Sequence, residues 1–155
     1  MSELVKTVCS VAAVCLMALA ADNSLGTWKL NVAKSSYGGA PMPVKNLVMI
    51  RQASADGVKV SQIGERVDGT ALNSSYTTRY DGKESVVEGT SPFDRITVRQ
   101  LDANTFVDER KKKDGLFHAK VKTLISEDGK TLTTVATGMN SEGKQFTSTL
   151  IHERQ

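Results

Sequence analysis

Apolar and polar residues alternate along most of the chain after residue 20, with the period of two that is typical of half-buried strands. Short turn signals interrupt this alternation at Asp56-Gly57, Asp68-Gly69, Asp81-Gly82, Asp114-Gly115 and Asp128-Gly129. Asp-Gly pairs favour the positive φ angles of tight hairpins. The pattern therefore predicts about ten strands, over residues 26–31, 45–53, 57–66, 70–80, 83–89, 94–101, 104–113, 116–126, 130–138 and 144–154.

Near-consecutive hairpins of similar length predict an all-β fold. We expect an antiparallel up-and-down barrel of about eight to ten strands that forms one domain over residues 21–155. Closing the sheet removes exposed edges that would otherwise pair with other chains. The segment 31–44 contains Gly38-Gly39, Pro41 and Pro43, so we expect a long loop there, either a plain crossover or a lid over the barrel mouth.

Alternation within each strand predicts which side chains face the barrel interior. The apolar members of this face are Trp28, Leu30, Leu47, Met49, Val58, Val60, Leu72, Tyr76, Val87, Ile96, Val98, Phe106, Phe117, Ala119, Val121, Leu132, Ala136, Phe146 and Leu150. The polar members are Arg51, Gln62, Thr78, Gln100, Asp108, Arg110, Thr134, Ser148 and His152. A dry core would not tolerate so many polar groups without partners, so this face predicts a cavity that water can enter. A bulge, for instance at Gly64, would reverse the alternation after it.

Residues 1–20 have the pattern of an export signal. Lys6 lies in a short polar start, an apolar run extends over 8–20, and small residues at Ala18 and Ala20 predict cleavage after Ala20. The apolar run is shorter than the roughly 20 residues that a membrane-spanning helix needs, so we expect no stable membrane insertion after cleavage. The signal predicts a periplasmic or extracellular protein.

Composition and residue spacing further limit the functions that the chain could have. Cys9 and Cys15 both lie within the predicted signal, so the mature chain would contain no cysteine. The net charge of +3 is too small to indicate a nucleic-acid-binding protein, which usually carries a concentrated basic stripe. His118 and His152 are the two histidines, and neither belongs to a metal-ligand spacing. No serine has the context of a hydrolase nucleophile, so no motif names a reaction, although an enzyme remains an alternative.

The strand Gly26-Thr27-Trp28, the Asp-Gly hairpins and Arg154 in the last strand together resemble the calycin superfamily of lipocalins and fatty-acid-binding proteins. More narrowly, the chain is similar to secreted bacterial proteins described as lipocalin-like. The resemblance implies that Trp28 packs against Arg154 at the barrel bottom and that both residues are structural. Fatty-acid-binding proteins carry Arg-x-Tyr in the last strand, where this chain has Leu150-Ile151-His152. This departure argues against a fatty-acid carboxylate site of that kind.

These observations favour an extracytoplasmic binding protein that holds a small, mostly apolar ligand in the barrel interior. We expect the ligand to contact Met49, Arg51, Gln62, Tyr76, Gln100, Phe106, Arg110, Phe117 and His152. No cofactor is expected. The resemblance also leaves a haem open, because nitrobindin-like haem barrels begin with a Gly-x-Trp strand and ligate iron through a late histidine, here His152.

Two alternatives remain open. The first is an envelope protein-interaction module with a filled barrel, which a cavity too small for a ligand would favour. The second is an isomerase or cyclase on the same barrel, with Asp108 or His152 as the proton-active group. Asp108 and Arg110 lie about 7 Å apart on one strand face, close enough for an ion pair or for an acid or base beside a cation.

Overall fold

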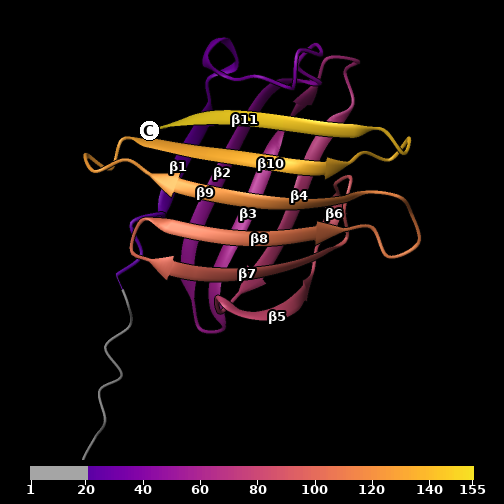
Figure 1. The fold of residues 1–155 in the computed structure, drawn as a ribbon. Coiled ribbons are helices and arrows are strands. Elements are labelled where there is room, and N and C mark those ends of the chain that lie inside the picture. Colours follow the sequence, from indigo (N-terminus) through magenta and orange to yellow (C-terminus); the bar gives the residue numbers. More distant parts are fainter. Residues whose placement is uncertain (1–20) are drawn as a thin grey trace, which may run out of the picture.

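The computed structural model describes residues 21–155, and these residues form an antiparallel β-sheet that is nearly closed into a barrel (Figure 1). The predicted export signal and both cysteines lie outside the described residues. The strands are β1 (Gly26–Leu30), β2 (Val44–Ser54), β3 (Gly57–Arg66), β4 (Ala71–Thr78), β5 (Asp81–Val86), β6 (Glu88–Thr90), β7 (Arg95–Asp102), β8 (Thr105–Lys111), β9 (His118–Ile125), β10 (Thr131–Met139) and β11 (Gln145–Arg154).

The strands follow one another around the barrel in the order β5-β7-β8-β9-β10-β11-β1-β2-β3-β4-β6. Hairpins join most neighbours, as the regular turn signals predict. One exception is β1, which pairs with the C-terminal strand β11 on one side and with β2 on the other. Figure 1 shows β7–β11 as one wall that crosses a second wall formed by β1–β4. Side chains from the two walls meet in the interior between them.

The barrel has eleven strands where eight to ten were expected, because Val87 interrupts the strand predicted over 83–89. The residues before Val87 form β5 and pair with β7, whereas those after it form β6 and pair with β4. The Val87 side chain itself is buried in the barrel. The two ends of the sheet are therefore consecutive in the chain, and β4 and β5 separate there to leave a seam.

The turns follow the Asp-Gly signals at most positions. Gly57, Gly69 and Gly129 all adopt positive φ angles, which a residue with a Cβ reaches only with strain. The turn between β4 and β5 differs from the prediction, because it lies at residues 79–80 and not at Asp81-Gly82. Tyr80, expected in the strand 70–80, takes a φ of 59° in this turn. Gly64 keeps its register with Leu47. Register shifts lie at 44–46, 81–84 and 100–102 instead.

Two apolar clusters fill most of the interior, and strand alternation predicted nearly all of their members. One contains Val87, Phe93, Ile96, Val98, Phe117, Ala119, Val121 and Ala136. The other contains Trp28, Met49, Val58, Val60, Phe106, Ile125 and Leu132. Leu72, Tyr76, Phe146 and Leu150 are less buried than the rest of the predicted inward face. Tyr76 and Tyr80 pack against both clusters.

The loop 31–44 packs onto one end of the barrel, above β11 in Figure 1. It begins with a 3-10 helix, η1 (Val32–Lys34), and continues with a bridge between Ser36 and Thr149 of β11. Tyr37 stacks on Phe146 with ring centroids 5.5 Å apart. The loop thus extends the pairing of β11 beyond the end of β1. Within residues 21–155, no helix is long and apolar enough to span a membrane.

Candidate functional site

The barrel interior contains a small cavity of about 40 Å³ at the boundary of the two apolar clusters. Its lining is unusually polar for a buried space. The lining residues are Leu47, Met49, Arg51, Gln62, Tyr76, Phe93, Val98, Phe106, Asp108, Arg110, Thr123, Thr134, Leu150 and His152. They come from both walls of the barrel, so the fold brings together side chains that are far apart in the sequence.

Seven of the nine residues expected to contact a ligand line this cavity, and two do not. Gln100 lies at the far end of its strand, where its side-chain amide donates to the Ala21 carbonyl at 2.8 Å. Phe117 stacks between Phe93 and Phe146 within an apolar cluster. Alternation places both residues on the inward face, but it does not indicate how far along the barrel axis they lie.

Asp108 and Arg110 form an ion pair in the cavity wall. Arg110 donates through Nε to Oδ1 of Asp108 at 2.6 Å and through Nη2 to Oδ2 at 3.2 Å. The guanidinium also lies 5.1 Å from the centre of the Phe93 ring. Burial alone would lower the pKa of Arg110, but the Asp108 carboxylate outweighs burial and the pKa is raised. Both carboxylate oxygens are occupied by this pair.

Replacing Asp108 by asparagine should lower the free energy of unfolding by about 2 kcal/mol, because the bonds from Arg110 lose their charged acceptor. The cost is smaller than for a fully buried pair, since 20% of the Arg110 side chain is exposed. Urea unfolding measures the change. Glu109→Gln is the matched control, because Glu109 is exposed and forms no ion pair within residues 21–155. Equal losses in the two variants would contradict the prediction.

His152 is the least satisfied polar side chain of the interior. It is only 3% exposed, and neither ring nitrogen has a hydrogen-bond partner within the described chain. Burial lowers the pKa of His152 to about 4, and the nearby Arg110 guanidinium adds to this effect. The ring is therefore neutral at neutral pH, with one nitrogen as a donor and the other as an acceptor.

Arg51 is anchored at the opposite side of the cavity by groups that sequence alternation did not identify. Its Nε donates to Oγ of Ser24 at 2.9 Å, and its Nη2 donates to the Tyr80 hydroxyl at 3.1 Å. The Tyr80 hydroxyl donates in turn to Oδ2 of Asp22 at 2.6 Å. Burial is the main cause that raises the pKa of Tyr80 to about 12. No local sequence signal marks these partners, because they precede the first strand or lie in a turn.

The cavity lining offers both hydrogen-bond donors and acceptors, and it carries one positive charge that no carboxylate contacts directly. The Arg51 guanidinium donates to the Ser24 and Tyr80 hydroxyls, whereas Arg110 is paired with Asp108. Neutral His152 adds one donor and one acceptor. A group that accepts hydrogen bonds, such as a carbonyl, a carboxylate or a water oxygen, therefore complements this lining.

The volume limits what the cavity can hold in this conformation. About 40 Å³ has room for a few water molecules, whereas pockets for drug-sized ligands have volumes of about 300–1,000 Å³. An apolar ligand of a dozen heavy atoms does not fit, and neither does a haem beside His152. Residues 21–155 contain no group of three or more His, Cys, Asp or Glu side chains that could hold a metal ion.

Tyr76 belongs to the lining of two spaces, the cavity and a hollow of about 400 Å³ beside β4 and β5. The other residues of this hollow are Lys59, Ser75, Thr77, Ser85, Val86 and Glu88.

No protein-family model, no curated protein and no solved structure gives a significant match to this chain.

Proposed function

We propose that the protein is a binding protein that holds a small ligand with a hydrogen-bond-accepting group inside the barrel. The unpartnered ring of His152 carries this proposal, because buried polar groups in native proteins nearly always have partners. The resemblance to lipocalins and fatty-acid-binding proteins, whose barrels hold ligands, supports the same proposal. We further propose that the protein acts outside the cytoplasm after removal of residues 1–20.

The cavity lining favours a more polar ligand than the mostly apolar one expected from the sequence. The Arg51 guanidinium, which contacts no carboxylate directly, and the unpartnered His152 ring suit a polar or anionic group more than a mostly apolar one. A larger ligand enters only if the cavity expands.

Thermal unfolding with small acceptor molecules tests this proposal. Sodium acetate, sodium nitrate and acetamide should each be tested at increasing concentration, and at least one should raise the midpoint, because binding to the folded state alone stabilises it. His152→Phe and His152→Gln should both weaken this increase. His118→Phe is the matched control, since His118 is exposed.

Nuclear magnetic resonance of the His152 ring nitrogens gives a second measurement. Their chemical shifts should move in a saturable way with the stabilising probe. A midpoint that rises equally in every variant would indicate a general salt effect. The proposal would also be wrong if no probe moves either the midpoint or the ring shifts.

The cavity volume of about 40 Å³ favours a second candidate function. In this candidate, water satisfies His152, the barrel is a filled scaffold, and the protein acts as an envelope interaction module through its outer surface. Native mass spectrometry of gently purified protein distinguishes the two candidates, because only the first predicts a retained small molecule.

The isomerase or cyclase alternative depends mainly on His152. Both carboxylate oxygens of Asp108 are bound to Arg110, so neutral His152 is the better placed proton acceptor. This alternative predicts a pH-dependent rate that disappears in His152→Gln. It is secondary because no motif indicates a substrate.

A further inference from the structure

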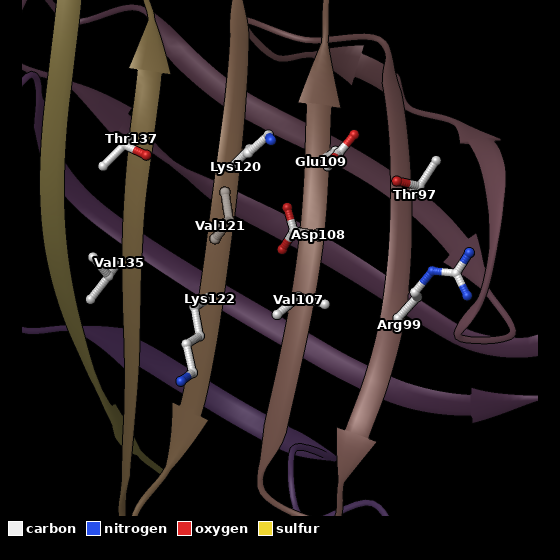
Figure 2. A pocket seen from close by; sticks show the side chains of 11 residues that line it. Thr97, Arg99, Val107, Asp108, Glu109, Lys120, Val121, Lys122, Val135 and Thr137 are labelled. Atoms are coloured by element: carbon white, nitrogen blue, oxygen red, sulfur yellow. The ribbon is translucent and has the colours of Figure 1, made fainter.

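A hollow of about 640 Å³ lies on the outer side of the sheet, separate from the barrel interior. Figure 2 shows that its side chains come from the neighbouring strands β7, β8, β9 and β10. Alternation sends Asp108 and Val121 inward, and both are buried. The side chains on either side of them along the strands face outward.

The outward side chains form two rows that cross the strands. The first row is Arg99, Val107, Lys122 and Val135, each paired with the next across the ladder. Cations and valines therefore alternate along this row. Adjacent strands lie about 4.8 Å apart, so the two cations lie on strands about 10 Å apart.

The second row lies beside the first and consists of Thr97, Glu109, Lys120 and Thr137. It adds a third cation and one carboxylate to the hollow. Hydroxyl groups stand at both ends of this row. The hollow thus combines an excess of positive charge with a partly apolar floor.

The three cations of the hollow have carboxylates near them but form no ion pair with these within residues 21–155. Arg99, Lys120 and Lys122 form no ion pair with any residue of 21–155, whereas the nearby Lys111 binds Glu84 at 2.7 Å. All three side chains belong to exposed residues. Nearby carboxylates compensate these charges only in part, so the exposed ends of the three side chains can still pair with a partner.

We propose that this basic hollow binds an acidic peptide segment that lies extended across the strands. Carboxylates of the peptide pair with Arg99, Lys120 and Lys122, while apolar side chains between them contact Val107 and Val135. In a polyproline II conformation, every third residue returns to the same face after a rise of about 9 Å. This is close to the spacing of the strands that carry Arg99 and Lys122.

The floor of the hollow favours a peptide over other anionic polymers. Polyphosphates and acidic polysaccharides lack the apolar side chains that would cover Val107 and Val135. Nucleic acids are commonly held by aromatic stacking platforms, and none of the residues that line this hollow is aromatic. This inference is independent of the ligand proposed for the interior.

The probe is a fluorescein-labelled peptide, Glu-Val-Ser-Glu-Leu-Ser-Glu-Val-Ser-Glu, titrated with the full chain by fluorescence anisotropy. Binding should be saturable and should weaken about tenfold in a variant with both Lys120→Glu and Lys122→Glu. It should also weaken when the ionic strength rises from about 0.05 to about 0.5 M. Val135→Ser, which leaves the charge unchanged, should weaken binding about threefold.

The matched control carries Lys29→Glu and Lys59→Glu, the same change in charge at exposed sites of β1 and β3. It should bind within about twofold of the unchanged protein. Unfolding midpoints of all variants establish that they remain folded. If the control bound the peptide as weakly as the Lys120→Glu, Lys122→Glu variant, net charge alone would explain the effect, and the proposal would be overturned. If polygalacturonate, or a peptide with serine at its apolar positions, bound more tightly than the probe peptide, the hollow would be a site for a polyanion instead. If the probe peptide showed no saturable binding, the site would be excluded.

Discussion

Replacing Trp28 by alanine should lower the free energy of unfolding by about 3–5 kcal/mol, the usual cost of truncating a fully buried large aromatic side chain. Trp28 is 0% exposed, and its Nε1 donates to the Ser24 carbonyl at 2.8 Å. The Arg154 guanidinium lies 4.1 Å from the ring centre, the contact that the calycin resemblance implies. Arg154 also donates to the carbonyls of Asn23, Leu25 and Gly129. The change therefore removes the ring on which Arg154 stacks, and Arg154 joins three parts of the barrel end.

Urea unfolding followed by far-ultraviolet circular dichroism measures this loss, because the variant no longer contains the only tryptophan of the chain. Trp28→Phe is the graded control, since it keeps a ring under Arg154 but removes the hydrogen bond to Ser24. It should lose less stability than Trp28→Ala. A loss below about 1.5 kcal/mol for Trp28→Ala would mean that the site collapses around the missing ring.

Acid should destabilise the protein partly through His152. Its pKa is about 4 in the folded protein, below the value of 6.5 for a free side chain. Between these values the unfolded chain binds more protons, so the free energy of unfolding falls as the pH falls from 6.5 toward 4. The full contribution of His152 is about 3 kcal/mol, because each pKa unit corresponds to about 1.4 kcal/mol.

The comparison of the protein with its His152→Phe variant isolates this effect. Carboxylates whose pKa is lowered in the folded state, such as Asp94 and Asp128, also lose stabilising contacts in acid, but they do so in both proteins. The difference in unfolding free energy between the two should change by about 3 kcal/mol across this range. Parallel pH profiles would mean that His152 is hydrated well enough to titrate normally.

The strand pattern was predictable because alternation and turn chemistry agree over short distances. Gly57, Gly69 and Gly129 stand where positive φ is needed, and the strands between them keep a period of two. Two details depended on tertiary packing instead. Tyr80 takes a positive φ where its ring packs on Phe106 and its hydroxyl binds Asp22. Val87 breaks its strand where the two ends of the sheet meet, and its side chain is buried in the barrel.

The candidate site was predictable in part for the same reason. Alternation identifies the inward face, so Arg51, Arg110 and His152 reach one cavity as expected. It does not measure depth along the barrel, which explains why Gln100 lies elsewhere. Alternation also gives no information on side-chain volume. The cavity is left with only about 40 Å³ because Phe93, Phe106 and the other large residues interdigitate.

The pairing of β1 with β11 places the start and the end of the described chain side by side. The ladder from Trp28 to Arg154 joins residues that are separated by nearly the whole sequence. Contacts of such long range raise the contact order and slow folding, because a large loop must close before they form. During synthesis, a chain of this topology leaves one edge of its first strand unpaired until the final ten-residue strand is made.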